Sequence, residues 1–316
     1  MSRTRQSKDA QIASSTVIGS GAPGIDQAPS ATRPKECENV ELTSSVCVVT
    51  GASSGIGRRT ALDLARAGAR VCVVARRRAV LEEVLAEIGG SDRGHSLFVG
   101  DVADRAQVRD LAEHMSATYG RCDVLVNNAG YSDDGTFEGP DDVERLERVM
   151  AVNFYGVVYC TGELLPLILE STPSSIVNIS SMAGRLGLGG NASYSASKFA
   201  INGFSESLHI DLAGRDVCVS LIEPGFIPTE GFPHPGLQKD SVMRHALGTV
   251  EDVSAAIIDA IENRKMERVV PRWYHLLQLP RVLLPRLHRW ASLKMNEARS
   301  RRKDDGTEER TQESGS

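Results

Sequence analysis

The chain has 316 residues, a hydrophobic fraction of 41%, a charged fraction of 24% and a net charge of -5. This composition is typical of a soluble globular protein, and it provides no basic field that would favour nucleic acid. No apolar run approaches the roughly 18 uninterrupted residues of a membrane span, and no basic-then-apolar N-terminal signal is visible, so we expect a cytoplasmic protein. The six cysteines show no metal-ligand spacing. We therefore expect reduced thiols and no metal site.

The predicted elements begin after a polar N-terminal extension. Residues 1–42 contain no Phe, Tyr or Trp, and we predict that they are disordered. From 43 to 271, short β-branched runs such as 46–51 and 69–76 alternate with helical patterns such as 58–68. Strands joined by helices imply parallel pairing with right-handed crossovers. We predict a single α/β domain, a doubly wound, Rossmann-like parallel sheet with helices on both faces.

The first predicted strand leads into a glycine-rich turn, TGASSGIG, at residues 50–57. Gly51, Gly55 and Gly57 allow the backbone to turn tightly, and they let a pyrophosphate approach the first amides of the following helix. A tight turn without a ligand is the alternative. The position at the first strand-to-helix junction favours dinucleotide binding.

The second predicted strand ends at Ala75 and is followed by Arg76, Arg77 and Arg78. A sheet that binds NAD(H) commonly carries an acidic residue here for the ribose hydroxyls, whereas arginine pairs with a 2'-phosphate. We therefore predict NADP(H) in preference to NAD(H), with Arg76 as the phosphate contact. Solvated arginines at the start of a helix are the alternative.

The candidate chemistry lies between residues 174 and 211. Tyr194 and Lys198 are four residues apart, so on a helix they share one face. A tyrosine has an unperturbed pKa near about 10, and a nearby lysine ammonium favours its phenolate. Ser181, at the end of the preceding apolar run, adds a second hydroxyl. These three groups could polarise a carbonyl oxygen and hand it a proton, although the tyrosine and lysine spacing alone is also found in exposed helix pairs.

In this order, the segments resemble the short-chain dehydrogenase/reductase family, in its single-domain branch, over roughly residues 45–271. The motifs that carry the resemblance are TGASSGIG at 50–57, Asp101-Val102, NNAG at 127–130, Asn153 in VNFYG, Ser181, Tyr194 to Lys198, and PGFIPT at 224–229. The resemblance implies hydride transfer between a nicotinamide and a carbonyl or secondary alcohol. Ser181 would bind the substrate oxygen, Tyr194 would transfer the proton, and Lys198 would lower the pKa of Tyr194.

The resemblance also implies the cofactor contacts. Lys198 would bind the nicotinamide ribose, and Asn153 would anchor a water that links Lys198 to solvent. The cofactor would be lined by Gly51, Ser53, Ser54, Gly55, Ile56, Gly57, Asp101, Val102, Asn128, Ala129, Gly130, Tyr194, Lys198, Pro224, Gly225, Ile227 and Thr229. A structural turn at NNAG and a strand-end cap at Asp101 are the alternatives for those two motifs. A homo-dimer or homo-tetramer, packed through the Tyr194 helix and the helix before it, is a family tendency.

The substrate side is less specific. The loop at 182–188 and the stretch with Phe232, Leu237, Val242 and Met243 lean apolar, which suits a hydrophobic ketone, aldehyde or secondary alcohol. Residues 272–303 carry nine Lys or Arg against one acid, Glu297, and two prolines divide the segment into two short pieces. We expect an amphipathic segment at 272–295 that closes the substrate pocket, packs on a partner subunit or makes peripheral contact with a membrane, and a disordered tail at 296–316.

These observations favour a carbonyl reductase or alcohol dehydrogenase acting on a hydrophobic small molecule. A sensor or scaffold protein that binds NADP(H) without significant turnover is the alternative. The intact set of Asn153, Ser181, Tyr194 and Lys198 argues against it. An epimerase or dehydratase on the same fold is a third candidate, and it usually needs a differently equipped substrate region.

Overall fold

A computed structural model describes residues 39–228, 247–294 and 297. The predicted α/β class is confirmed, since seven parallel strands form one sheet in the order β3-β2-β1-β4-β5-β6-β7. The strands are β1 Val46–Thr50, β2 Arg70–Ala75, β3 Ser96–Val99, β4 Val124–Asn127, β5 Ser174–Ile179, β6 Val217–Pro224 and β7 Glu267–Val270. The strand order runs outward in both directions from the β1–β4 pair, and this reversal is where open α/β sheets bind their ligands.

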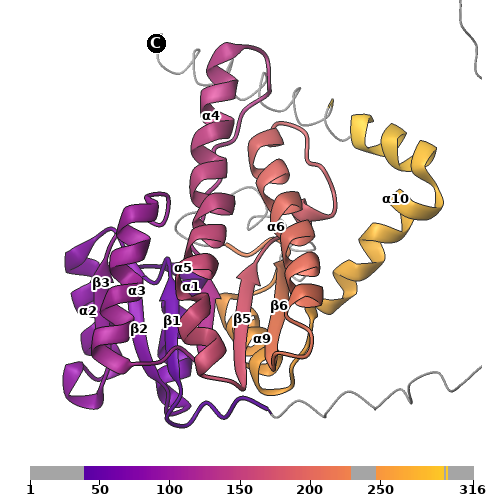
Figure 1. Cartoon of the computed structure of the whole chain (residues 1–316). Helices are drawn as coiled ribbons and strands as arrows, with labels where there is room; N and C mark the ends of the chain where they lie inside the picture. Colours follow the sequence, from indigo (N-terminus) through magenta and orange to yellow (C-terminus); the bar gives the residue numbers. More distant parts are fainter. Residues whose placement is uncertain (1–38, 229–246, 295–296, 298–316) are drawn as a thin grey trace, which may run out of the picture. The chain divides into compact units, whose positions relative to one another are not determined.

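Helices cover both faces of the sheet (Figure 1). They are α1 Gly55–Arg66, α2 Arg78–Ile88, α3 Arg105–Tyr119, α4 Pro140–Met150, α5 Gly156–Glu170, α6 Ala192–Asp211, α9 Val250–Glu262 and α10 Leu279–Leu283. Short 3-10 turns span Ser91–Arg93, Met182–Gly184 and Arg272–Gln278, and a π-helical turn, Ala151–Tyr155, joins α4 to α5.

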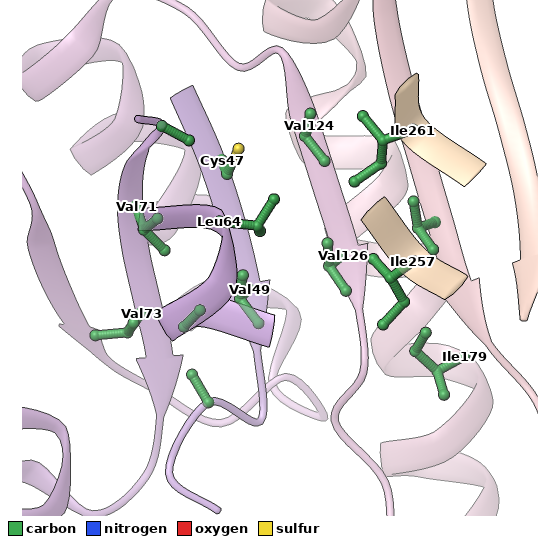
Figure 2. Packing of buried hydrophobic residues seen from close by; sticks show 14 of the residues in the cluster. Cys47, Val49, Leu64, Val71, Val73, Val124, Val126, Ile179, Ile257 and Ile261 are labelled. Atoms are coloured by element: carbon green, nitrogen blue, oxygen red, sulfur yellow. The ribbon is translucent and has the colours of Figure 1, made fainter. Parts of the chain in front are cut away.

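Alternate residues of the strands pack into two separate hydrophobic cores, one on each face of the sheet. On one face, Val49 and Val126 pack with Leu64 of α1 and Ile257 of α9 (Figure 2). On the other face, neighbouring strand residues such as Val48 pack with side chains of α3 and α5. Because successive side chains of a strand point to opposite faces, strands buried on both sides read as unbroken β-branched runs.

The core begins slightly before the domain start expected at residue 43. Val40 and Leu42 are 3% and 4% exposed and belong to the core on the α1 and α9 face. The chain therefore packs onto the sheet before β1. Residues 1–38 lie outside the described part of the chain, as does most of the predicted tail at 296–316.

One helical run in the described part of the chain, Pro140–Glu170, is long and apolar enough to cross a membrane by length and composition alone. Its apolar residues Cys160, Leu164 and Ile168 pack in the core against the sheet. A core helix of this kind passes the same test, so the run is weak evidence for a membrane span.

Candidate active site

The glycine-rich turn after β1 lies against the loop that follows β4. The Asn128 side chain donates to the Thr50 carbonyl at 2.9 Å, and the backbone amides of Asn128 and Ala129 donate to the Thr50 hydroxyl at 3.0 and 3.1 Å. A Cβ added to Gly57 would lie 2.4 Å from both the Asn128 amide nitrogen and the Gly51 carbonyl oxygen. Only glycine fits there, so the two loops form one continuous backbone wall.

This wall fits the phosphates of a dinucleotide. Gly51 and Gly55 have φ of 66° and 53°, a region that favours glycine. The N-cap residue of α1, Ser54, makes no side-chain hydrogen bond to the first turn. The helix start is therefore left without a side-chain cap, in the arrangement that receives an anion.

At the end of β2 the structure separates the three arginines. The Arg76 guanidinium lies 3.8 Å from the Asp101 carboxylate, and Arg77 donates to the Ser53 hydroxyl at 3.3 Å. Arg78 instead lies 3.8 Å from Glu82 on its own helix. Arg77 therefore contacts the glycine-rich turn, whereas Arg76, the predicted phosphate contact, lies beside Asp101.

The strand-end residues Asp101 and Val102 have clear structural contacts. An Asp101 carboxylate oxygen accepts from the Ala103 amide at 3.0 Å, which caps the chain as it leaves β3. Val102 is 7% exposed, and a Cβ on Gly156 of α5 would lie 2.8 Å from its side chain. Contact of either residue with an adenine stays a prediction.

Ser181, Tyr194 and Lys198 converge beyond the carboxyl end of β5. Ser181 begins a 3-10 turn, and its hydroxyl accepts from the Ala183 amide at 3.1 Å. The Tyr194 and Ser181 hydroxyls are hydrogen-bonded to each other. Lys198 lies one turn further along α6, 5.4 Å from the Tyr194 ring centroid, and its ammonium donates to the Ile179 carbonyl at 2.9 Å. The spacing in the sequence therefore becomes one compact group of two hydroxyls and an amine.

Burial sets the protonation of this group. It raises the pKa of Tyr194 to about 12, opposed by the hydrogen bond from Ser181 and reinforced by the charge of Asp134. Burial also lowers the pKa of Lys198 to about 7. The expected lowering of the Tyr194 pKa by Lys198 is not seen, because loss of water favours the neutral form of both groups. Tyr194 thus holds its proton, as a general acid must before it acts.

Asn153 lies in the π-helical turn between α4 and α5, and π turns are frequent at functional sites. Its side-chain oxygen accepts from the Tyr131 amide at 2.9 Å, and its side-chain nitrogen donates to the Tyr131 carbonyl at 2.9 Å and the Ser197 hydroxyl at 3.0 Å. The side chain therefore ties the loop after β4 to α6. Both amide hydrogens are used in these contacts, and the anchoring of a water by Asn153 stays a prediction.

Gly130 completes the connection between the two halves of the site. A Cβ on Gly130 would lie 3.1 Å from the Asn153 side-chain oxygen and 3.7 Å from the Lys198 ammonium. The loop after β4 therefore runs directly past the amine. This places the predicted nucleotide residues and the predicted catalytic residues in one continuous site.

A buried ion pair that sequence reasoning missed holds the other side of the site. Glu223 is 0% exposed near the end of β6, and one carboxylate oxygen accepts from Arg185 at 2.6 Å and from the Asn202 amide at 2.8 Å. The Arg185 guanidinium also lies 2.8 Å from Glu267 of β7. Burial raises the pKa of Glu223, and the charge of Arg185 opposes that rise. A lone acid in the apolar run VCVSLIEP was the available signal.

The predicted residues after β6 are only partly described. A Cβ on Gly225 would lie 1.9 Å from the ring of Tyr274, which is 3% exposed, so Tyr274 packs directly against this glycine. Ile227 is 5% exposed and belongs to the core on the α1 and α9 face. Thr229 and the apolar stretch that contains Phe232, Leu237, Val242 and Met243 lie outside the described residues.

Tyr274 is the second residue that sequence reasoning missed. It belongs to the C-terminal segment, yet it packs with Met182 and Val269, and Leu186 lies against the same cluster. Its hydroxyl is hydrogen-bonded to the backbone of Phe226. The start of the C-terminal segment therefore forms part of the wall beside Ser181. We refer to residues 181–188 and Tyr274 as the substrate side, and to residues 50–57, 75–77, 128–130 and 224–227 as the nucleotide side.

A separate cavity of about 530 Å³ lies at the amino end of the strands, lined in part by Ser45, Arg121, Asp123 and Pro173. Asp123 accepts from the Val46 amide at 2.8 Å and pairs with Arg121, so these polar groups hold β1 and β4 together. Parallel α/β sheets bind their ligands at the carboxyl edge, which is the opposite edge. This cavity is therefore not the candidate active site.

Comparison with known proteins agrees with this geometry. The sequence profile described as short chain dehydrogenase matches residues 45–235. The chain is 36% identical over 190 residues to the 3-oxoacyl-(acyl-carrier-protein) reductase FabG of Thermotoga maritima, covering 60% of this chain and 77% of the relative. It is 34% identical to dehydrogenase/reductase SDR family member 7B of Mus musculus, covering 72% and 73%. It is 33% identical to 11-beta-hydroxysteroid dehydrogenase 1A of Arabidopsis thaliana, covering 79% and 74%.

Proposed function

The chain belongs to the short-chain dehydrogenase/reductase family and is an NAD(P)(H)-dependent oxidoreductase, and on that premise we propose that it interconverts a carbonyl and a secondary alcohol of a hydrophobic small molecule. The observation that carries this proposal is the convergence of the Ser181 and Tyr194 hydroxyls with the buried amine of Lys198. Both hydroxyls can reach one substrate oxygen, because they are already hydrogen-bonded to each other.

The residues divide the reaction between them. The nicotinamide, when bound, supplies or accepts the hydride. Ser181 donates a hydrogen bond to the substrate oxygen and orients it. Tyr194 gives that oxygen a proton in reduction or removes the proton in oxidation. A protonated Lys198 stabilises the negative charge left on Tyr194. Burial lowers the pKa of Lys198 to about 7, so binding of the cofactor and substrate must raise this pKa to keep the lysine protonated.

The proposed cofactor is NADP(H). Ala75 leaves no carboxylate at the end of β2, and the guanidinium groups of Arg76 and Arg77 border Asp101 and Ser53. Both arginines are the kind of group that pairs with a 2'-phosphate, and β2 itself ends in Ala75, which carries no carboxylate to compete with that phosphate. If the cellular partner is NADPH, the enzyme works in the direction of reduction.

The cofactor assignment is tested by the ratio of kcat/KM for NADPH and NADH. The double change Arg76→Ala, Arg77→Ala should lower this ratio by at least about tenfold, since each charged hydrogen bond contributes about 1.5–3 kcal/mol. Arg78→Ala is the matched control, because Arg78 pairs with Glu82. A higher kcat/KM of the wild type for NADH than for NADPH would contradict the NADP(H) assignment.

The substrate class follows from the wall of the substrate side. Met182, Leu186 and Tyr274 form an apolar cluster directly beside Ser181. Such a wall favours a hydrophobic ketone, aldehyde or secondary alcohol. We further propose a homo-dimer or homo-tetramer packed through α5 and α6, in the cytoplasm, with peripheral membrane contact through the C-terminal segment.

The central experiment measures NADPH consumption by wild type and Tyr194→Phe across hydrophobic ketones, aldehydes and quinones, with NADPH binding measured in parallel. We expect turnover of at least one carbonyl by wild type, and a loss of about 10²–10⁴ in kcat with retained binding in the variant. Tyr155→Phe is the control, since Tyr155 is 47% exposed and stacks on Tyr159. Binding by both proteins without any turnover would favour the sensor or scaffold alternative.

A further inference from the structure

The C-terminal segment, residues 272–294, carries a large exposed apolar surface. In the described part of the chain, ten of the seventeen exposed large hydrophobic side chains fall within it. Examples are Val282 at 75%, Leu283 at 68% and Leu293 at 65% exposed. The other seven are spread over residues 137–266, which is ordinary for a folded protein. A concentration of this kind marks an interaction surface.

The 3-10 turn Arg272–Gln278 and two short helices present this surface, one helical piece more than the two expected from the prolines. Pro280 lies in the first turn of α10, which ends before Leu284. A second helix runs over residues 285–294. In the second helix Leu287, Trp290 and Leu293 recur every three residues, so they lie along one side. Their exposed fractions are 52%, 59% and 65%. This helix therefore has an apolar side that no described residue covers.

The charge of the segment indicates the kind of partner. Residues 272–294 contain Arg272, Arg281, Arg286, Arg289 and Lys294 and no acid, a net charge of +5 with His neutral. The whole chain carries -5, so the rest of it carries -5 minus +5, or -10. Two copies of this segment packed face to face would bring ten cations together. A layer of anionic lipid headgroups would instead meet the cations, while Leu and Trp enter the acyl boundary.

Two of the segment's described contacts join it to the residues around Ser181 and Lys198. Tyr274 packs on Gly225 and Met182, and the Arg281 guanidinium lies 5.0 Å from the ring centroid of Phe199, the residue after Lys198. The exposed apolar surface is therefore continuous in sequence with the wall of the site.

We propose that residues 272–294 dock the enzyme on an anionic phospholipid surface, with Leu287 and Trp290 inserted and Arg286 and Arg289 on the headgroups. Docking places the substrate side next to the bilayer. The substrate class, which rests on the proposed function, is a lipophilic carbonyl or alcohol that partitions into membranes. The docking itself requires no turnover.

The test is co-sedimentation of the full chain with vesicles of phosphatidylcholine, alone or mixed with phosphatidylserine. We expect wild type to bind the mixed vesicles at least tenfold more tightly, with binding weakened by added salt. Arg286→Gln with Arg289→Gln should weaken binding on the order of thirtyfold, since each cation near the surface contributes about a factor of five. Leu287→Glu with Trp290→Glu should abolish it.

The control is Met266→Glu, because Met266 is 53% exposed and lies outside both the segment and the proposed subunit interface of α5 and α6. NADPH binding and circular dichroism of each variant show whether a loss of vesicle binding comes from the altered surface or from unfolding. These measurements do not depend on turnover, so this test is distinct from that of the proposed function. Equal sedimentation of wild type and the two double variants would overturn the proposal. The proposal would also be overturned if wild type bound no vesicles and the Leu287→Glu, Trp290→Glu variant dissociated from an oligomer. That result would assign the surface to contact with a second copy of this chain.

Discussion

The nucleotide side and the substrate side of the site are held together by different kinds of contact. On the nucleotide side, Gly57, Thr50 and Asn128 join two loops mainly through backbone atoms, with no room for a further Cβ. On the substrate side, the loop after Ser181 is held by long side chains, chiefly Arg185 to Glu223. Backbone walls tolerate few residue types, whereas a side-chain pair can be changed in both members. The nucleotide side can therefore be recognised from short sequence motifs, whereas the substrate side cannot.

Lys198 lies where the two sides meet, and its replacement should have the largest effect. Lys198→Met should lower kcat by about 10²–10⁴, because Tyr194 then has no nearby cation to stabilise its phenolate. Lys265→Met, on an exposed residue, is the control. The measurement is kcat at saturating NADPH and substrate. A variant with full activity would show that the amine takes no part in proton transfer.

The same lysine predicts a pH dependence of stability in the cofactor-free protein. Its pKa in the folded protein is about 7, against an ordinary lysine pKa of 10.5, so between these two pH values the unfolded chain binds more protons. The free energy of unfolding contributed by Lys198 should therefore rise as pH increases from about 7 toward 10.5 and stay at its lowest below 7. Urea denaturation of wild type and Lys198→Met should show the two curves diverging over this window; parallel curves would contradict the shift.

Breaking the ion pair should affect the substrate side alone. Arg185→Met leaves the buried Glu223 without its cation, which should lower the free energy of unfolding by about 3 kcal/mol, the low end for a buried pair because Arg185 is 23% exposed. The substrate KM should rise while the NADPH Kd stays near its wild-type value.

The double variant Arg185→Met, Glu223→Gln should recover part of the stability, because no buried charge is left unpaired. Urea denaturation and paired measurements of KM and Kd test both variants. Equal losses of substrate and NADPH binding in Arg185→Met would remove the distinction between the two sides.

A glycine change should have the smallest effect on stability and act on the nucleotide side. Gly57→Ala forces a Cβ against the Gly51 carbonyl and should lower the free energy of unfolding by about 1–3 kcal/mol, with weaker NADPH binding. Gly162→Ala is the matched control in α5, where an added Cβ meets nothing within 4 Å and should stabilise by up to about 1 kcal/mol. Calorimetry and NADPH titration would show whether the two alanines differ in sign.

The sequence predicts most of the fold and the centre of the site, because both depend on local signals. Buried β-branched runs that end at glycine predicted the parallel sheet, and the four-residue spacing of Tyr194 and Lys198 on one helix predicted that they lie close together. Arg185 and Glu223 are 38 residues apart, and neither follows a periodic pattern that could pair them. The packing of Tyr274 on Gly225 is of the same kind. The raised pKa of Tyr194 depends on burial in the folded protein, which spacing alone does not reveal.

The central position of β1 has a consequence for how the chain is made. β1 pairs with β2 on one side and with β4 on the other, and the bond from the Val46 amide to Asp123 spans 77 residues. During synthesis, β1 to β3 emerge first, and one edge of β1 stays unpaired until β4 leaves the ribosome. Non-local parallel pairing is slow and exposes apolar strand edges. We expect the nascent chain to depend on chaperones over this interval, and to commit to its fold only once β4 has been translated.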